Sequence, residues 1–305
     1  MSNNITFFWN ISSRLNGIYL YKFERFVFYL KAISYIVLNF KKPLKCIKLI
    51  KNKKYPFVLN KKNGSTIKIK NREGLSIVLK KLDEKIFFED KNLIINFQNK
   101  ILKFKYYKSI EIDIFLQNIY SKLCVKNKIL IDVGGNVGDS ALLFDTFEPK
   151  KIIMLEPQPK FLEFAKENLK INNYFSSIEM INAALSNKSG YLKINYEKSG
   201  QDFKIIEDLE NGIEIPKITL QDIFLNQNHD EFILKMDCEG CEYDVLLNSP
   251  DEDLNKFNAI LLEFHEGFLN ISKRLESLGF KVNILNCKYT PEKTHRGHLL
   301  ALKKP

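Results

Sequence analysis

Two patterns of hydrophobic and polar positions divide the chain near residue 128. After that point, short apolar runs alternate with amphipathic segments in the order strand, helix, strand, helix. This alternation is typical of a mostly parallel sheet with helices on both faces. The predicted strands are residues 129–133, 151–155, 178–184, 232–236, 259–264, 281–285 and 298–302. The predicted helices are residues 139–147, 159–172, 243–247 and 271–278.

The residues before this α/β region predict a separate N-terminal extension. Up to about residue 50, aromatic and aliphatic residues recur at helical spacing with Lys and Arg between them. We therefore expect residues 1–54 to form a basic amphipathic helical arm. Residues 55–125 carry short alternating apolar runs and then one helical face, which indicates a small β-rich subdomain with a linking helix. The α/β domain would then span residues 126–305.

Turn and loop signals add detail to this outline. Asn63-Gly64 and Asn99-Lys100 lie between apolar runs and are turn candidates. The segment 191–216 is polar and contains two glycines. We expect this segment to form an extension or a flexible loop over the site.

Composition and charge narrow the surroundings of the chain. Its 305 residues are 45% hydrophobic and 27% charged, which is ordinary for a globular protein. The formal net charge is +11, and the excess of Lys is concentrated in residues 22–128. Because phosphate and base recognition favour Arg over Lys, we expect no nucleic-acid partner. We expect a solvated basic surface, with a peripheral membrane contact through the N-terminal arm as the alternative.

Neither a membrane span nor a disulfide framework is expected. The nearest candidate for a span, residues 26–40, is interrupted by Lys31 and is shorter than the roughly 20 residues that cross a bilayer. The five cysteines are an odd number scattered along the chain, so a reducing cytoplasm is the simplest compartment. Cys238 and Cys241 have redox-motif spacing without a thioredoxin-like context, and we assign them a structural role.

The most informative segment joins the first strand of the α/β region to its helix. An apolar strand ends in Asp132 and is followed by Gly134, Gly135, Asn136 and Gly138. Small residues let the backbone turn sharply and approach a ligand closely before a helix begins. The segment predicts a nucleotide-type binding turn, although glycine-rich turns also occur for structural reasons alone.

A carboxylate at the end of the second strand supports the binding turn. Glu156, followed by Pro157, comes 24 residues after Asp132, a separation at which a carboxylate accepts hydrogen bonds from both ribose hydroxyls. A nicotinamide enzyme would carry Gly at the position of Asn136. An acidic residue heading the turn suits a cationic ligand without phosphate, such as the methionine part of S-adenosylmethionine. At the end of the third strand, Ala184 leaves room for an adenine ring.

Charged residues cluster at the ends of the fourth and fifth predicted strands. Lys235, Asp237 and Glu239 follow one apolar run, and Glu263 and His265 end the next. The carboxyl ends of central parallel strands are where such folds bind ligands. Asp237 is a candidate general base toward a hydroxyl group, and Lys235 could orient a neighbour or meet an oxyanion.

The same cluster also suits a divalent metal ion. Its carboxylates, together with His265, could bind Mg²⁺ or Mn²⁺. Carboxylates this close in sequence also act as acid and base without metal, and we favour this interpretation. His295 and His298, near the end of the chain, are interpreted as surface or strand residues.

Six segments give the chain a resemblance to the FkbM family of methyltransferases. They are residues 131–139 (IDVGGNVGD), 155–157 (LEP), 182–186 (NAALS), 218–222 (ITLQD), 235–242 (KMDCEGCE) and 261–265 (LLEFH). The segment 235–242 is the most distinctive of them. In the other segments, Gly135 stands where Ala is more usual, and Gln221 stands where Asp is common. The resemblance covers roughly residues 128–285.

The resemblance implies a class I methyltransferase fold, a Rossmann-like and mostly parallel sheet of seven strands with helices on both faces. It implies S-adenosylmethionine as the methyl donor and O-methylation of a sugar, a glycan or a related natural product. The donor-binding positions that carry over are Asp132, Gly134, Asn136, Gly138 and Glu156. Asp237, Glu239 and Glu242 carry over as motif residues without an assigned role.

Two other functions stay open as alternatives. A nicotinamide-dependent sugar oxidoreductase uses the same strand, turn and helix. A non-catalytic, membrane-associated binding protein would use the basic arm as its working surface. The joint presence of Asp132, Glu156, Asp237 and Glu239 favours an enzyme. We expect direct in-line methyl transfer to a hydroxyl held near Asp237.

Overall fold

The computed structural model describes most of the α/β region and parts of the N-terminal extension. The described residues are 29–52, 54–64, 66–69, 75, 85–89, 92–107, 109–110, 112–174, 176–194, 212–225, 227, 231–290 and 294–303. The chain divides into two compact units, residues 1–108 and 109–305. Each unit is described by itself.

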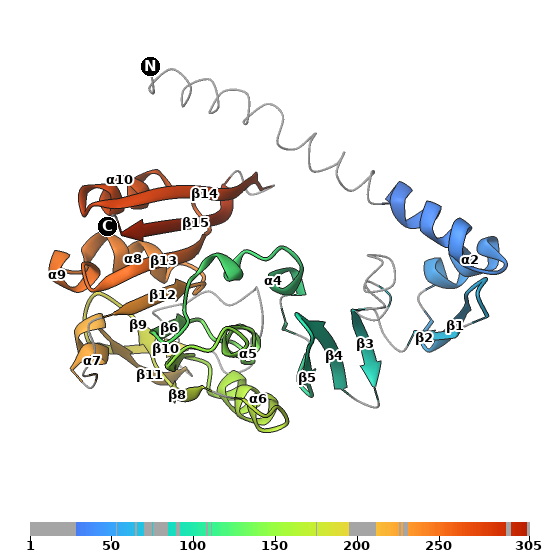
Figure 1. The fold of residues 1–305 in the computed structure, drawn as a ribbon, viewed down its shortest axis with the longest axis horizontal. Helices are drawn as coiled ribbons and strands as arrows, with labels where there is room; N and C mark the ends of the chain where they lie inside the picture. The colour runs from blue at the N-terminus through green and yellow to red at the C-terminus, as the bar shows by residue number, and fades with distance from the viewer. Residues whose placement is uncertain are drawn as a thin grey trace, which may run out of the picture. The chain divides into compact units, whose positions relative to one another are not determined.

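A seven-stranded sheet is the centre of the second unit, drawn in green to red in Figure 1. Its strand order is β14-β15-β13-β12-β6-β7-β8. The strands are β6 (Ile129–Val133), β7 (Lys151–Leu155), β8 (Ser177–Ile181), β12 (Phe232–Met236), β13 (Phe257–Phe264), β14 (Phe280–Tyr289) and β15 (His295–Lys303). Five of them pair in parallel, whereas β15 runs antiparallel to both β13 and β14. This order, with one reversed strand, is the class I methyltransferase fold.

Helices complete the second unit and begin close to where the sequence places them. They are α4 (Ile112–Leu116), the 3-10 helix η1 (Tyr120–Lys122), α5 (Asp139–Asp145), α6 (Pro159–Lys170), α7 (Leu220–Phe224), α8 (Cys241–Asn248), α9 (Asp251–Leu254) and α10 (Leu269–Ser277). Thr219 and Asp222 form a capping box at the start of α7. The Asp222 carboxylate therefore stabilises the start of this helix, because it accepts hydrogen bonds from the backbone N–H and the hydroxyl group of Thr219.

Alternate residues of the central strands face opposite sides of the sheet. On one side, Ile131 of β6, Leu234 of β12 and Leu262 of β13 are fully buried in an apolar cluster with residues of α7, α8, α9 and α10. Because side chains alternate along a strand, the neighbouring positions Asp132 and Lys235 face the other side. Both are buried, so the sheet places two charges within its interior.

A small second sheet corrects two predictions. It has the order β10-β11-β9, with β9 at Ala184–Leu185, β10 at Gly190–Ile194 and β11 at Ile213–Ile218. The strand predicted over residues 178–184 ends at Ile181, because Ala184 pairs with β11 instead. The loop predicted over residues 191–216 is wrong at both ends, where β10 and β11 pair antiparallel. Its middle lies outside the described residues.

The first unit contains short helices and two small sheets. Residues 29–39 are helical and are followed by α2 (Pro43–Asn52). The sheets are β1 (Phe57–Asn60) with β2 (Thr66–Ile69), and β3 (Ile86–Glu89) with β4 (Asn92–Phe97) and β5 (Lys100–Phe104). Asn63-Gly64 lies between the paired strands β1 and β2, as predicted. The second turn lies one residue earlier than predicted, at Gln98 and Asn99, because Lys100 already pairs with Phe97, and Asn99 has the positive φ of 64° that a tight hairpin turn requires. Among the described residues, we find no helix that could cross a membrane.

Candidate active site

The glycine turn between β6 and α5 has a backbone that few side chains would permit. Gly134 has a φ of 77°, and a Cβ atom there would overlap the carbonyl oxygen of Asp237. Gly135 leaves the space that the Met154 side chain fills. Gly138, with a φ of 82°, is the N-cap of α5. The turn therefore packs directly on the end of β12, which brings the first and fourth parallel strands to one edge.

Lys235 and Asp132, on neighbouring strands of the sheet, stabilise this turn. They are directly opposite in the parallel pairing of β12 and β6, and Lys235 Nζ lies 2.9 Å from Asp132 Oδ1. The same ammonium donates to the carbonyl oxygen of Gly134 at 3.0 Å, and Ser140 donates to Asp132 at 2.6 Å. Burial lowers the pKa of Lys235, but the carboxylates of Asp132 and Asp237 outweigh it and raise the pKa. Lys235 is thus a charged residue that positions the turn.

Glu156 lies at the end of β7, beside the turn. Its carboxylate accepts backbone N–H groups from Asn136 at 2.9 Å and from Gln158 at 2.8 Å. Asn182 in turn donates to the carbonyl oxygens of Glu156 and Pro157. Burial raises the pKa of Glu156 to about 7, although both N–H bonds oppose the shift. The carboxylate is therefore fixed in place and ionises near neutral pH.

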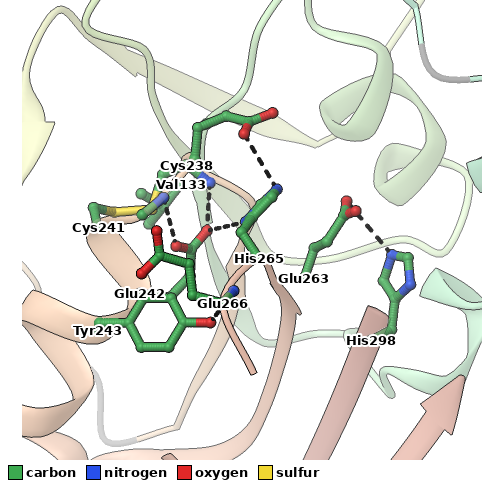
Figure 2. Close-up of polar contacts among 12 residues, drawn as sticks. Val133, Cys238, Cys241, Glu242, Tyr243, Glu263, His265, Glu266 and His298 are labelled. Atoms are coloured by element: carbon green, nitrogen blue, oxygen red, sulfur yellow. Dashed lines mark hydrogen bonds and ion pairs between the residues drawn. A yellow bond between two sulfur atoms is a disulfide. The ribbon is translucent and has the colours of Figure 1, made fainter. Parts of the chain in front are cut away.

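The loop between β12 and α8 is held by Glu242, as Figure 2 shows. The two oxygens of this fully buried carboxylate accept the N–H groups of Cys238 and Gly240, each at 2.8 Å. Cys238 and Cys241 are joined by a disulfide across the same loop. That bond was not predicted, because the sequence shows the spacing but not the geometry. In the distinctive segment 235–242, the first residue, Lys235, thus stabilises the glycine turn. The last residue, Glu242, stabilises the loop of the segment itself.

Asp237, Glu239, Glu263 and His265 meet at the carboxyl ends of β12 and β13. His265 Nε2 lies 3.3 Å from Glu239 Oε2, and His265 Nδ1 lies 3.7 Å from Glu242 Oε1 (Figure 2). Asp237, Glu263 and His265 each offer an atom within 4.8 Å of the others. Burial raises the pKa of Glu239, which His265 opposes. The prediction that these side chains share one edge is therefore met in the structure, while their roles stay predictions.

A cavity of about 230 Å³ has Glu263 on its wall. Polar residues that line it include Gln117, Lys288, Arg296 and His298. Of these, sequence reasoning missed Lys288 and Arg296, and it interpreted His298 as a surface or strand residue. His298 is a strand residue of β15, but it is buried at 9% exposure. The signal that could have found it is an imidazole at the start of the apolar run of residues 299–302.

The structure places eleven of the twelve predicted site residues in two groups and Ala184 apart from both. Those around the glycine turn and the end of β7 are Asp132, Gly134, Gly135, Asn136, Gly138, Glu156 and Pro157, and Lys235 joins them from below. Those at the ends of β12 and β13 are Asp237, Glu239 and His265. Ala184 lies in β9 of the small sheet.

The chain is similar in sequence to known methyltransferases. The sequence profile described as "Methyltransferase FkbM domain" matches residues 132–282. The methyltransferase sdnD of Sordaria araneosa is 22% identical over 226 residues, which are 60% of this chain and 87% of that protein. Protein 158B of Sulfolobus islandicus rod-shaped virus 1 is 28% identical over 147 residues, 48% of this chain and 66% of that protein.

Solved structures of similar fold have low identity to the chain. A methyltransferase from Pyrococcus furiosus has a TM-score of 0.40 at 17% identity and covers 67% of this chain and 90% of its own. Precorrin-6y C5,15-methyltransferase from Geobacter metallireducens has a TM-score of 0.39 at 15% identity, with coverage of 65% and 93%. The profile match spans the glycine turn, Glu156 and the edge formed by β12 and β13. The chain therefore carries a methyltransferase FkbM domain at residues 132–282.

Proposed function

We propose that the chain transfers a methyl group from S-adenosylmethionine to a hydroxyl group of a sugar, a glycan or a related natural product. The observation that carries this proposal is the position of Glu156. Its carboxylate is buried beside the glycine turn and is held by two backbone N–H groups, at 2.9 Å and 2.8 Å. A carboxylate fixed at this point of the fold is suited to accept both hydroxyl groups of the donor's ribose.

The turn itself favours a sulfonium donor over a dinucleotide. Asp132 heads it, and Asn136 has a φ of 47° and donates its side-chain amide to the carbonyl oxygen of Ser109. The half-buried side chain of Asn136 leaves less room for a pyrophosphate than glycine would. Donor binding beside carboxylates is electrostatically favourable for a cation and unfavourable for a phosphate anion.

The transfer step would occur at the edge formed by β12 and β13. The acceptor oxygen attacks the methyl carbon as the carbon–sulfur bond breaks, and the sulfonium becomes the neutral thioether of S-adenosylhomocysteine. The acceptor's hydroxyl proton passes to the Asp237 carboxylate, which acts as the general base. Alignment of oxygen, carbon and sulfur supplies most of the acceleration.

The cavity supports a hydroxylated acceptor. Its wall combines the carboxylate of Glu263, the cations Lys288 and Arg296 and the amides Gln117 and Asn286. A wall with positive, negative and neutral hydrogen-bonding groups suits an uncharged ligand that has several hydroxyl groups.

A methyl-transfer assay with radiolabelled S-adenosylmethionine and a panel of sugars and glycans tests this function. Asp237→Asn is expected to lower kcat by roughly 100-fold, because general base catalysis contributes about that much. S-adenosylhomocysteine affinity should stay within about two-fold, since the variant changes only the acceptor side. Glu266→Gln, at an exposed position near the same edge, is the matched control. Full turnover by Asp237→Asn would refute the assignment of the base.

A further inference from the structure

We propose that Asp237, Glu263, His265 and His298 bind a divalent metal ion at the wall of the cavity. The sequence favoured an interpretation without metal. The proposed site adds His298, which lies far from the other three residues in the sequence. Metal binding itself does not depend on the proposed function. The role of the ion, to hold oxygen atoms of the acceptor, does rest on that function.

Three neighbouring strands place polar side chains in one row. Glu263 of β13 pairs directly with His298 of β15, and Asn286 of β14 pairs with His298 from the other side. A register shift in β14 between Ile284 and Asn286 brings Asn286 opposite the histidine. Such irregularities re-aim side chains and are frequent beside active sites.

The hydrogen bonds of Asn286 fix the tautomer of His298. The backbone N–H of His298 donates to Asn286 Oδ1 at 2.8 Å, so the amide atom that faces it must be the oxygen. The same oxygen lies 3.1 Å from His298 Nδ1, which must therefore carry a proton and donate. In the neutral ring, Nε2 then presents a lone pair. A histidine held through Nδ1 in this way is the usual arrangement of an imidazole metal ligand.

The lone pair of His298 Nε2 points at Glu263 without a proton between them. Nε2 is buried and has no hydrogen-bond partner among the described residues. Its nearest carboxylate atom is Glu263 Oε2, at 3.9 Å, which is beyond hydrogen-bond distance. Figure 2 marks this pair with a dashed line. Two ligands of one ion, each bound at about 2.1 Å, lie about 3 to 4 Å apart, so this separation leaves space for a cation.

The remaining ligands approach from the adjacent strands. Asp237 follows β12, and His265 follows Glu263 by two residues, at the end of β13. One atom of each of Asp237, Glu263 and His265 lies within 4.8 Å of the other two. His265 is 6% exposed, and its Nδ1 has no hydrogen-bond partner in the described part of the chain. His298 joins this group of three through Glu263, at 3.9 Å, so the proposed site offers two carboxylates and two imidazoles.

This donor set selects the class of ion. Carboxylates suit Mn²⁺ and Mg²⁺, whereas imidazoles suit Fe²⁺, Co²⁺ and Zn²⁺, so a mixed set favours first-row transition ions over Mg²⁺. The nearest cation on the donor side, Lys235, is committed to Asp132 at 2.9 Å. Because Glu263 and His298 line the cavity, the ion would face an acceptor there. It would lower the pKa of a bound hydroxyl, and Asp237 could still receive the proton on its second oxygen.

The test is a titration of the full-length, chelator-treated protein with MnCl₂, in which electron paramagnetic resonance measures free Mn²⁺. We expect one Mn²⁺ per chain with a Kd of roughly 10 μM, displaced by ZnCl₂, which binds such sites more tightly. His298→Ala and Glu263→Gln should each weaken binding by about 10-fold or more, and Asn286→Leu by about 10-fold through His298. Glu266→Gln should bind like the wild type.

Two results would overturn the metal site. One is a wild-type protein whose free Mn²⁺ signal matches that of buffer up to about 1 mM, far above the affinity expected of a four-ligand site. The other is binding that His298→Ala and Glu263→Gln leave unchanged while both variants keep the wild-type circular dichroism spectrum. Calorimetry with S-adenosylhomocysteine on the same samples separates this failure from a failure of the proposed function, because donor binding needs none of the four ligands.

Discussion

On the donor side of the active site, Lys235 and Asp132 meet at 2.9 Å and are both buried, and each has further hydrogen bonds to the turn or to α5. On the acceptor side, His265 lies 3.3 Å from Glu239, and His298 lies 3.9 Å from Glu263. The charges of the first group neutralise each other and hold the turn, whereas the second group has buried nitrogen atoms without hydrogen-bond partners among the described residues. Charged residues in one site can therefore hold a backbone turn in place or bind a ligand. The distances between the paired charged atoms distinguish the two roles.

The largest effect is expected when one partner of the donor-side ion pair is removed. Lys235→Met leaves the Asp132 carboxylate buried without its cation, which should lower the free energy of unfolding by about 3 to 5 kcal/mol. Denaturant titration measures the loss. The double variant Asp132→Leu with Lys235→Met should recover part of it, because no lone charge remains. A loss below about 1 kcal/mol in the single variant would show that the pair does not hold the turn.

A methyl group at Gly134 should have the next largest effect. Gly134→Ala combines a φ of 77° with overlap of the Asp237 carbonyl oxygen, so we expect a loss of about 3 kcal/mol in stability and no measurable donor binding. Gly240→Ala is the matched control, because its φ of 124° is also unfavourable but nothing lies within 4 Å of the added atom. It should cost only about 1 to 2 kcal/mol. Equal losses in the two variants would mean that the close approach to β12 is unimportant.

Opening the disulfide tests how far the loop depends on it. Cys238 and Cys241 close a short loop, so Cys238→Ser with Cys241→Ser should lower the free energy of unfolding by about 2 kcal/mol. Donor affinity should stay nearly constant, because the Glu242 carboxylate still binds the N–H groups of residues 238 and 240. Cys124→Ser, at an exposed free cysteine, is the control. Thiol titration of the unreduced wild type checks that the bond forms, and five reactive thiols would contradict it.

The smallest effect is expected from pH, through Glu156. Burial raises its pKa to about 7, so below pH 7 the carboxyl is protonated and accepts ribose hydroxyls less well. Affinity for S-adenosylhomocysteine should therefore rise by about 10-fold, or about 1.4 kcal/mol, between pH 6 and pH 8. Calorimetry at both pH values measures the change. Glu156→Gln should bind weakly and without this pH dependence, and an equal slope in that variant would assign the titration to another group.

Local patterns predicted much of the fold and the donor side. The strands at residues 129–133, 151–155 and 232–236 have the predicted bounds because a charged residue precedes each run and a glycine or a carboxylate follows it. The glycine turn and Glu156 were also found, since their spacing is short and repeats a known geometry.

The features that were missed depend on pairing between distant segments. The sequence shows His298 beside an apolar run, but only the antiparallel register and the irregularity in β14 place it between Glu263 and Asn286. Lys235 was predicted at the carboxyl ends of the strands, where it lies. Its ion pair with Asp132 depends on the register of the parallel strands β12 and β6, which the sequence does not show. Propensity and periodicity describe one segment at a time and do not specify such cross-strand contacts.

Binding of S-adenosylhomocysteine, measured by calorimetry beside NAD⁺, tests the account most directly. We expect one S-adenosylhomocysteine per chain and no heat from NAD⁺. We also expect that Glu156→Ala weakens donor binding by about 30-fold or more, because two ribose hydrogen bonds to a charged group are lost. Glu163→Ala, at an exposed position of α6, should bind like the wild type. Binding of NAD⁺ without binding of S-adenosylhomocysteine would contradict the account.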